Sequence, residues 1–292
     1  MSEKHLGAVL LALAASIWGG MYVVSKVVLD VVSPIALVWL RYVIALVALV
    51  LAAWVTRQSW RVRWRDVPLV VCIGIVGYAI SIWTQFLGTK LSTAQMGAMI
   101  TSATPAFMVV FGRILLGERI TLRKAWSVGL ATIGVLLIVG IGGMGSIGRQ
   151  QYVAGGAILV VAALTWALMS VLVKRVPVEY SQLVVTTYAI LSATVAITPV
   201  GVAELHGFGE LFNRPVLWGG ILYLGIVSTA GAFFLWNKGL QMVDAASGGL
   251  YFFFQPLVGT ILGWILLGER VTLTFWLGAA LVLVGVFLAV KE

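Results

Sequence analysis

The chain has 292 residues, of which 61% are hydrophobic and only 10% are charged, with a mean hydropathy of +1.08. Soluble domains carry about 25% charged residues, so the composition argues against a soluble protein and indicates a bilayer environment. The net charge of +9 does not indicate a nucleic-acid partner, because the basic residues cluster in short loops between apolar stretches, where they orient membrane helices. The single cysteine, Cys72, excludes a disulfide framework and a cysteine metal cluster, and we expect neither a metal nor a cofactor.

Ten stretches are long and apolar enough to cross a bilayer at about 20 residues each. The first follows a short basic start that resembles a signal peptide, but its apolar run is long enough to be a retained helix. Backbone polar groups must be paired in lipid, so each span is predicted to be a helix. The expected spans are 6–29, 34–55, 67–88, 93–116, 123–141, 153–174, 181–201, 216–240, 246–267 and 273–290.

An internal repeat divides the chain. Residues 115–122 read LLGERITL and residues 266–273 read LLGERVTL, and Thr104-Pro105 and Gln255-Pro256 precede the two copies at matching positions. The predicted halves are 1–148 and 149–292, with five helices each. Because five is odd, the second half must cross the membrane in the opposite sense. The predicted fold is therefore all-α and integral to the membrane, with ten transmembrane helices in two inverted repeats around a central cavity.

The basic residues support this inversion. The first copy continues as GERITLRK and the second as GERVTLTF, which has lost Arg123 and Lys124. Most of the 19 Lys and Arg residues fall in loops on the side of the N-terminus. Positive loops prefer the cytoplasm, so both termini are predicted to lie on the cytoplasmic side of the inner (plasma) membrane.

With the doubled LLGER motif and its upstream prolines, the chain resembles the EamA-type transporters of the drug/metabolite transporter superfamily. The resemblance covers nearly the whole chain, and the amino-acid exporters of the YddG type are similar. It implies a basket in which helices one, three, four, six, eight and nine line the cavity, with the fifth and tenth packed outside.

Polar side chains at helical spacing indicate which faces meet the cavity. Ser247, Tyr251 and Gln255 recur every four residues in the ninth span. The third span carries Tyr78 with Ser81 and Gln85, and the fourth carries Thr101 and Thr104. Unpaired polar groups are costly in hydrocarbon, so these stripes should face water, substrate or another helix. Simple hydrogen bonding between helices is the alternative interpretation.

Aromatic residues and one arginine complete the predicted substrate site. Trp18 and Trp166 occupy equivalent positions near the middle of their spans, and Trp83 and Trp236 form a second pair. They could form walls for an apolar or aromatic substrate, or simply pack. Arg41 is an intramembrane charge that could bind a substrate carboxylate or extend to the membrane surface.

Two further pairs follow from the repeat. Pro105 and Pro256 should bend their helices and could act as hinges, or they could be static kinks. Glu118 and Glu269 lie in tight turns, where we expect them to cap the following helix.

No acid falls near the middle of a span, so a carboxylate proton relay and capture of organic cations are not expected. The sequence predicts a transporter rather than an enzyme, because no histidine accompanies the intramembrane serines. The preferred function is export of small metabolites by alternating access, with aromatic or neutral amino acids as substrates. A multidrug exporter is the alternative. Besides the substrate, only the bilayer is predicted as a partner, and the oligomeric state is not predicted.

Overall fold

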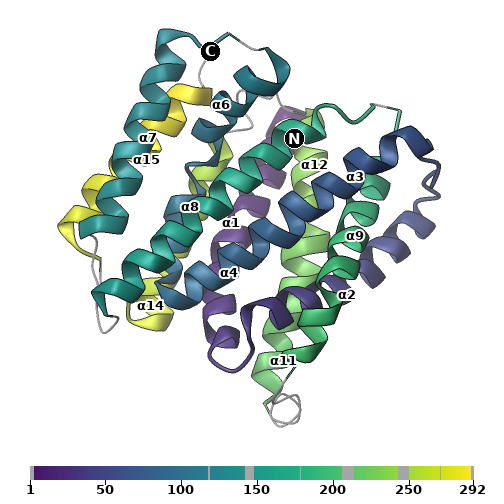
Figure 1. The fold of residues 1–292 in the computed structure, drawn as a ribbon, viewed down its shortest axis with the longest axis horizontal. Coiled ribbons are helices and arrows are strands. Elements are labelled where there is room, and N and C mark those ends of the chain that lie inside the picture. The colour runs from purple at the N-terminus through teal and green to yellow at the C-terminus, as the bar shows by residue number, and fades with distance from the viewer. Residues whose placement is uncertain are drawn as a thin grey trace.

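A computed structural model describes residues 3–117, 119–141, 148–177, 179–205, 214–242, 250–269 and 271–290. Each of the ten expected spans is helical over most of its described residues. Five spans of the first half are α1 (Glu3–Leu29), α2 (Pro34–Val55), α3–η2–α4 (Val67–Leu91), α5–α6 (Ala94–Leu116) and α7 (Leu122–Ile141). Those of the second half are α8 (Arg149–Val173), α9 (Gln182–Ala203), α11–η3–α12 (Pro215–Met242), η4–α14 (Leu250–Leu267) and α15 (Leu273–Val290). The start of α1 and the end of α15 lie at the same end of the bundle (Figure 1).

The third and eighth spans share an unusual conformation. A π-helix, η2 (Gly74–Ile80), separates α3 (Val67–Ile73) from α4 (Ser81–Leu91). At the equivalent place, the π-helix η3 (Tyr223–Gly231) separates α11 (Pro215–Leu222) from α12 (Ala232–Met242). The i→i+5 pattern widens the turn and frees backbone carbonyls, and such segments are frequent at functional sites.

The fourth and ninth spans are interrupted rather than bent. The fourth divides at Ser102 and Ala103 into α5 (Ala94–Thr101) and α6 (Thr104–Leu116), with Pro105 in the first turn of α6. The described part of the ninth starts with the 3₁₀-helix η4 (Leu250–Phe253), and Pro256 lies in the first turn of α14 (Phe254–Leu267). Both prolines thus stand in the first turn of an α-helix rather than in its interior, and their role as hinges or static kinks stays a prediction. Proline lacks an N–H, so it is tolerated where the chain starts a new helix.

The helix contacts follow the two-fold pattern of the repeat. Span one packs on spans eight and nine, and in the same way span six packs on spans three and four. Span two meets η3 as span seven meets η2. The fifth and tenth spans, α7 and α15, pack mainly on each other at one side of the bundle (Figure 1).

Glycines allow α7 and α15 to approach closely. A Cβ atom at Gly278 would lie 2.8 Å from the carbonyl oxygen of Gly134, and a Cβ at Gly134 would lie 2.6 Å from that of Gly278. Close backbone contact through small residues is the usual way in which helices associate in lipid, where no hydrophobic effect drives them together.

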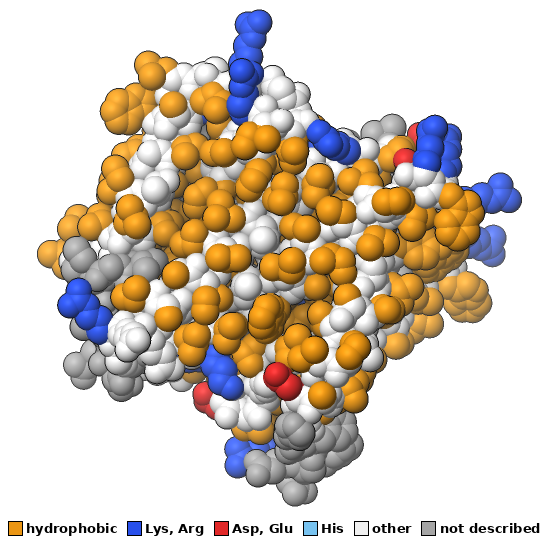
Figure 2. Space-filling view, in the orientation of Figure 1, with side chains coloured by type: hydrophobic (Ala, Val, Ile, Leu, Met, Phe, Trp, Pro, Cys, Tyr) orange, Lys and Arg blue, Asp and Glu red, His pale blue; other side chains and the backbone are white. Residues whose placement is uncertain are grey.

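The outer surface is that of a multi-pass membrane protein. Seven helical stretches in the described ranges are long and apolar enough to span a membrane, and Phe254–Leu267 and Leu273–Gly285 are shorter apolar helices. Hydrophobic side chains cover the middle of the face in Figure 2, whereas the charged side chains lie at its ends. Exposed large side chains such as Leu136 and Trp264, each 64% exposed, fit a surface solvated by lipid.

The glutamate of the second LLGER copy has a different structural role from the one expected. Glu269 does not cap α15, whose first turn is capped by the Thr272 hydroxyl accepting from Phe275 N. Its carboxylate instead accepts hydrogen bonds from the backbone N–H groups of Ala94 (2.7 Å) and Gln95 (3.0 Å), at the start of α5 in the other half. The first-turn donors of α5 needed an acceptor, and the tight turn at Gly268 (φ 64°) brings this one near. Glu118 lies outside the described residues.

This contact joins the two halves at the end of the bundle opposite the two chain ends. Burial raises the pKa of the Glu269 carboxyl, while the two N–H donors and Lys26 act in the opposite direction. Nearby, the Lys26 ammonium donates to the carbonyls of Thr89, Lys90 and Ser92 at 2.6–2.9 Å. The connection between spans three and four is therefore held from both sides.

Candidate functional site

A cavity with a volume of about 40 Å³ lies between the two halves. This is room for a few water molecules and is much smaller than an open ligand pocket. Its lining comes from spans one, three, four, six, eight and nine, with one residue from span two, while α7 and α15 contribute none. The lining residues are Trp18, Met21, Arg41, Ser81, Ile82, Gln85, Thr101, Thr104, Ala162, Trp166, Phe233, Phe252 and Gln255.

A hydrogen-bonded hub lies at one end of the cavity. The fully buried Tyr22 hydroxyl accepts from Gln85 Nε2 (2.5 Å) and Gln255 Nε2 (3.2 Å). It contacts Thr101 Oγ1 at 2.5 Å, and that hydroxyl in turn donates to the Gly97 carbonyl at 2.8 Å. Tyrosine has one hydroxyl proton, so the bonds run in one direction, from both amides through Tyr22 to Thr101.

This direction leaves an acceptor free. In this arrangement both glutamines present their NH₂ groups to the hub, which turns the Gln85 carbonyl oxygen away from it. Gln85 is 8% exposed, and its Oε1 atom has no hydrogen-bond partner among the described residues. A buried acceptor without a partner is costly, and this one belongs to a residue that lines the cavity.

Arg41 supplies the positive charge of the cavity. It is 2% exposed, and in the described part of the chain it is the one charged side chain that is buried. Its Nε donates to Thr229 Oγ1 at 2.6 Å, Nη1 donates to Met21 Sδ at 3.2 Å, and the guanidinium lies 5.4 Å from the Phe86 ring centroid. The ion pairs in the described ranges, Arg63–Glu179 and Arg65–Asp66, do not involve it. It does not extend to the membrane surface.

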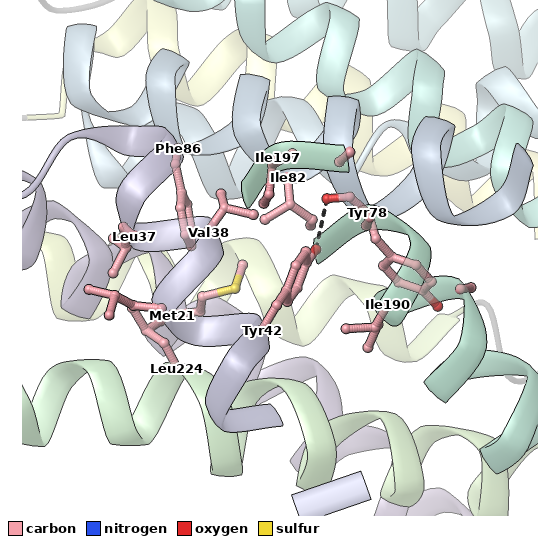
Figure 3. Close-up of a cluster of buried hydrophobic side chains, with 14 of the residues drawn as sticks. Met21, Leu37, Val38, Tyr42, Tyr78, Ile82, Phe86, Ile190, Ile197 and Leu224 are labelled. Carbon is pink, nitrogen blue, oxygen red and sulfur yellow. Dashed lines mark hydrogen bonds between the residues drawn. The ribbon is translucent and has the colours of Figure 1, made fainter. Parts of the chain in front are cut away.

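Aromatic rings form the wall of the cavity. The ring centroids of Trp18 and Phe233 are 5.7 Å apart, and those of Trp166 and Phe233 are 6.1 Å apart. Trp18 Nε1 also donates to the Ser228 carbonyl in η3 at 3.1 Å. In the same way, Tyr42 donates to the Tyr78 carbonyl in η2 at 2.8 Å (Figure 3). Each π-helix thus presents one carbonyl to an aromatic donor on a neighbouring helix.

The structure brings most of the predicted residues together. Lining the cavity are Trp18, Arg41, Thr101, Thr104, Trp166 and Gln255. Tyr78 and Trp236 lie directly behind this lining, Tyr78 6.0 Å from Trp166 and Trp236 5.2 Å from Trp18 between ring centroids.

Two predicted residues lie apart. Trp83 is 39% exposed on the outer surface of α4. Tyr251 stacks on Phe254 with ring centroids 6.3 Å apart and is not among the lining residues. The reason is the 3₁₀ conformation of η4: with three residues per turn, Phe252 and Gln255 share a side, where an α-helix would have aligned Tyr251 with Gln255. Ser247 lies outside the described residues.

Sequence reasoning did not single out Tyr22, Phe233 or Phe252. Tyr22 lies four residues after Trp18, so helical spacing from that residue could have identified it. Phe233 and Phe252 occur in apolar, aromatic stretches in which no single ring is distinguished by pattern.

A helical bundle of two related halves around an intramembrane cavity is the architecture typical of membrane transporters. The model of the EamA-like transporter family matches residues 5–140 and again residues 154–291, and the chain belongs to this family.

Curated relatives include a protein of Escherichia coli described as a probable amino-acid metabolite efflux pump, 27% identical over 99% of this chain and 96% of its own. Another, from Streptantibioticus cattleyicolor, is described as a probable terminal-alkyne amino-acid exporter, 26% identical over 95% of this chain and 91% of its own. A solved crystal structure has the same fold, with a TM-score of 0.65, 20% identity, and coverage of 97% of this chain and 96% of the other.

Proposed function

We propose that the protein exports amino acids with aromatic or other neutral side chains by alternating access between its two halves. The observation that carries this proposal is Arg41, a buried guanidinium without an acidic partner among the described residues, in a cavity walled by aromatic rings. A buried charge is costly unless it is paired. A substrate carboxylate would pair it, and guanidinium binds carboxylates in two-point geometry.

The rest of the cavity matches the other parts of such a substrate. Trp18, Trp166 and Phe233 offer a surface for an apolar or aromatic side chain. The small cavity volume suits an occluded conformation, which must open toward one side to admit substrate. The breaks before Pro105 and Pro256 are the places where we expect the hinges.

The descriptions of the two relatives as probable exporters of amino acids or their metabolites also support amino-acid export. We place the protein in the inner (plasma) membrane, with both termini in the cytoplasm, because the loops on that side carry most of the positive charge. A multidrug exporter of cationic compounds is not favoured, since the buried charge in the described cavity is itself positive.

The proposal is tested by counterflow of labelled amino acids into liposomes that contain the purified protein. We expect saturable uptake of phenylalanine and leucine, and a loss of about tenfold or more with Arg41→Gln, because charge-assisted hydrogen bonds are lost. Trp83→Phe is the matched control, since Trp83 lies on the outer surface. Counterflow equal to that of empty liposomes for every amino acid would reject the proposal.

A further inference from the structure

The described lining of the cavity contains one positively charged group and one neutral hydrogen-bond acceptor without a partner. Arg41 can hold a carboxylate, and among the described lining residues Gln85 is the one with a buried side-chain polar atom, its carbonyl oxygen, that has no hydrogen-bond partner. The buried polar and charged residues in the described ranges include no Asp or Glu. An acceptor of this kind takes a hydrogen bond from any donor, whether or not the donor is charged.

This arrangement treats the two charges of an amino acid unequally. Its carboxylate would neutralise Arg41, but its ammonium would bring a second positive charge into a cavity whose described lining offers no acidic side chain to neutralise it. Desolvating an ammonium without an opposite charge is unfavourable. A hydroxyl at the same carbon would donate to Gln85 without that cost.

We propose that the site takes 2-hydroxy carboxylates with an apolar or aromatic side chain, and binds them at least as well as the corresponding amino acids. The carboxylate pairs with Arg41, the hydroxyl donates to Gln85 Oε1, and the side chain lies against Trp18, Trp166 and Phe233. This inference rests on the proposed function for the position of the site, and it adds the chemical class of a second substrate.

Four ligands of the same shape separate the contributions: phenylalanine, 3-phenyllactate, 3-phenylpropionate and phenethylamine. Binding is measured by calorimetry on the purified protein, because neutral aryl acids cross bilayers unaided and would obscure a flux assay. We expect 3-phenyllactate to bind as tightly as phenylalanine or more tightly. 3-Phenylpropionate, which lacks the donor, should bind about three- to tenfold more weakly, and phenethylamine, which lacks the carboxylate, about 100-fold more weakly.

Two substitutions at Gln85 make the test specific. Gln85→Leu removes the acceptor and also the hydrogen bond to Tyr22, so the test is the ratio of two affinities measured on the same variant. On Gln85→Leu, 3-phenyllactate should lose its advantage over 3-phenylpropionate, and thermal unfolding reports whether the fold is intact. Gln85→Glu supplies a carboxylate for the ammonium, and should invert the order so that phenylalanine binds about tenfold more tightly than 3-phenyllactate.

The outcomes separate this inference from the proposed function. Binding of phenylalanine without binding of 3-phenyllactate overturns the inference and leaves amino-acid export standing. Binding of 3-phenyllactate without phenylalanine supports the inference and rejects amino acids as substrates. Equal affinities of the wild-type protein for 3-phenyllactate and 3-phenylpropionate would show that the hydroxyl makes no hydrogen bond to Gln85, and would overturn the inference. Absence of binding by every carboxylate rejects both.

Discussion

The wall of the cavity and its polar end relate differently to the internal repeat. The wall is built from equivalent positions, since Trp18 and Trp166 begin the same pattern in α1 and α8. The polar end is not built from equivalent residues. Ser33 and Ser181 are the N-cap residues of α2 and α9, and counting from them Arg41 in α2 corresponds to Ala189 in α9.

The hub is equally one-sided. Tyr22 lies four residues after Trp18, and the residue four after Trp166 is Ser170, whose hydroxyl donates only to a carbonyl of its own helix at 2.8 Å. Thr104 corresponds to Gln255. A duplicated scaffold gives two matching walls, but a substrate with a carboxylate at one end needs an asymmetric set of polar groups. Under the proposed function, we therefore expect the positions at which the halves differ to set specificity.

The largest effect is expected at the contact between α7 and α15, where the two halves contribute equivalent helices that do not line the cavity. Gly278→Leu would place Cβ 2.8 Å from the Gly134 carbonyl oxygen, and a backbone atom cannot move aside cheaply. We expect this change to lower the free energy of unfolding by about 3 kcal/mol or more through overpacking. The measurement is thermal unfolding and size-exclusion behaviour of the purified protein.

Gly129→Leu is the matched control, on α7, where a Cβ atom meets nothing within 4 Å. It should be neutral or slightly stabilising, because leucine favours helix over glycine. If both variants unfold at the same temperature, the contact between α7 and α15 does not hold the outer pair of helices together.

An intermediate effect is expected at the hub. Tyr22→Phe leaves two buried amide groups and the Thr101 hydroxyl with fewer partners, which should cost about 1–3 kcal/mol. The equivalent change in the other half, Ser170→Ala, should cost less than about 0.5 kcal/mol, because the carbonyl that it releases lies within a helix. Thermal unfolding of the two variants side by side measures the difference. If both variants lose the same free energy of unfolding, the hydrogen bonds of the hub do not stabilise the fold more than the single bond of Ser170.

The fold was predictable from sequence to a degree that the site was not. The ten spans follow from hydropathy and from the repeat, which act over many residues. The inner and outer sets of helices were implied by the family resemblance. The interruptions do not follow from these patterns. The prolines indicated where the interruptions occur, but whether the chain bends, breaks or adopts a 3₁₀ turn there depends on packing against neighbouring helices. The 3₁₀ conformation of η4 is the reason that Phe252, and not Tyr251, lines the cavity.

The same limit applies to single side chains in the site. Arg41 was identifiable because a charge within a span is rare. Trp83 was predicted as a site residue because it corresponds to Trp236 in the repeat, yet it lies on the outer surface of α4 and is 39% exposed. A helix face that meets lipid is as apolar as a buried face, so the sequence does not distinguish the two. The Gln85 acceptor could not be foreseen, because its orientation depends on Tyr22, a residue on another helix.

The smallest effect tests whether the wall is symmetric in energy as well as in position. Trp18 donates to the Ser228 carbonyl, whereas Trp166 packs on Phe233 at 6.1 Å with no hydrogen bond from its ring among the described residues. Trp18→Phe should therefore cost about 1 kcal/mol more than Trp166→Phe, the net value of one buried hydrogen bond. Thermal unfolding without ligand measures this difference, since both variants keep an aromatic ring in the wall. If the two losses are equal, the carbonyl of η3 finds another donor and the π-helix does not depend on Trp18. If Trp166→Phe costs more, stacking rather than hydrogen bonding holds the wall, and the two halves differ here also.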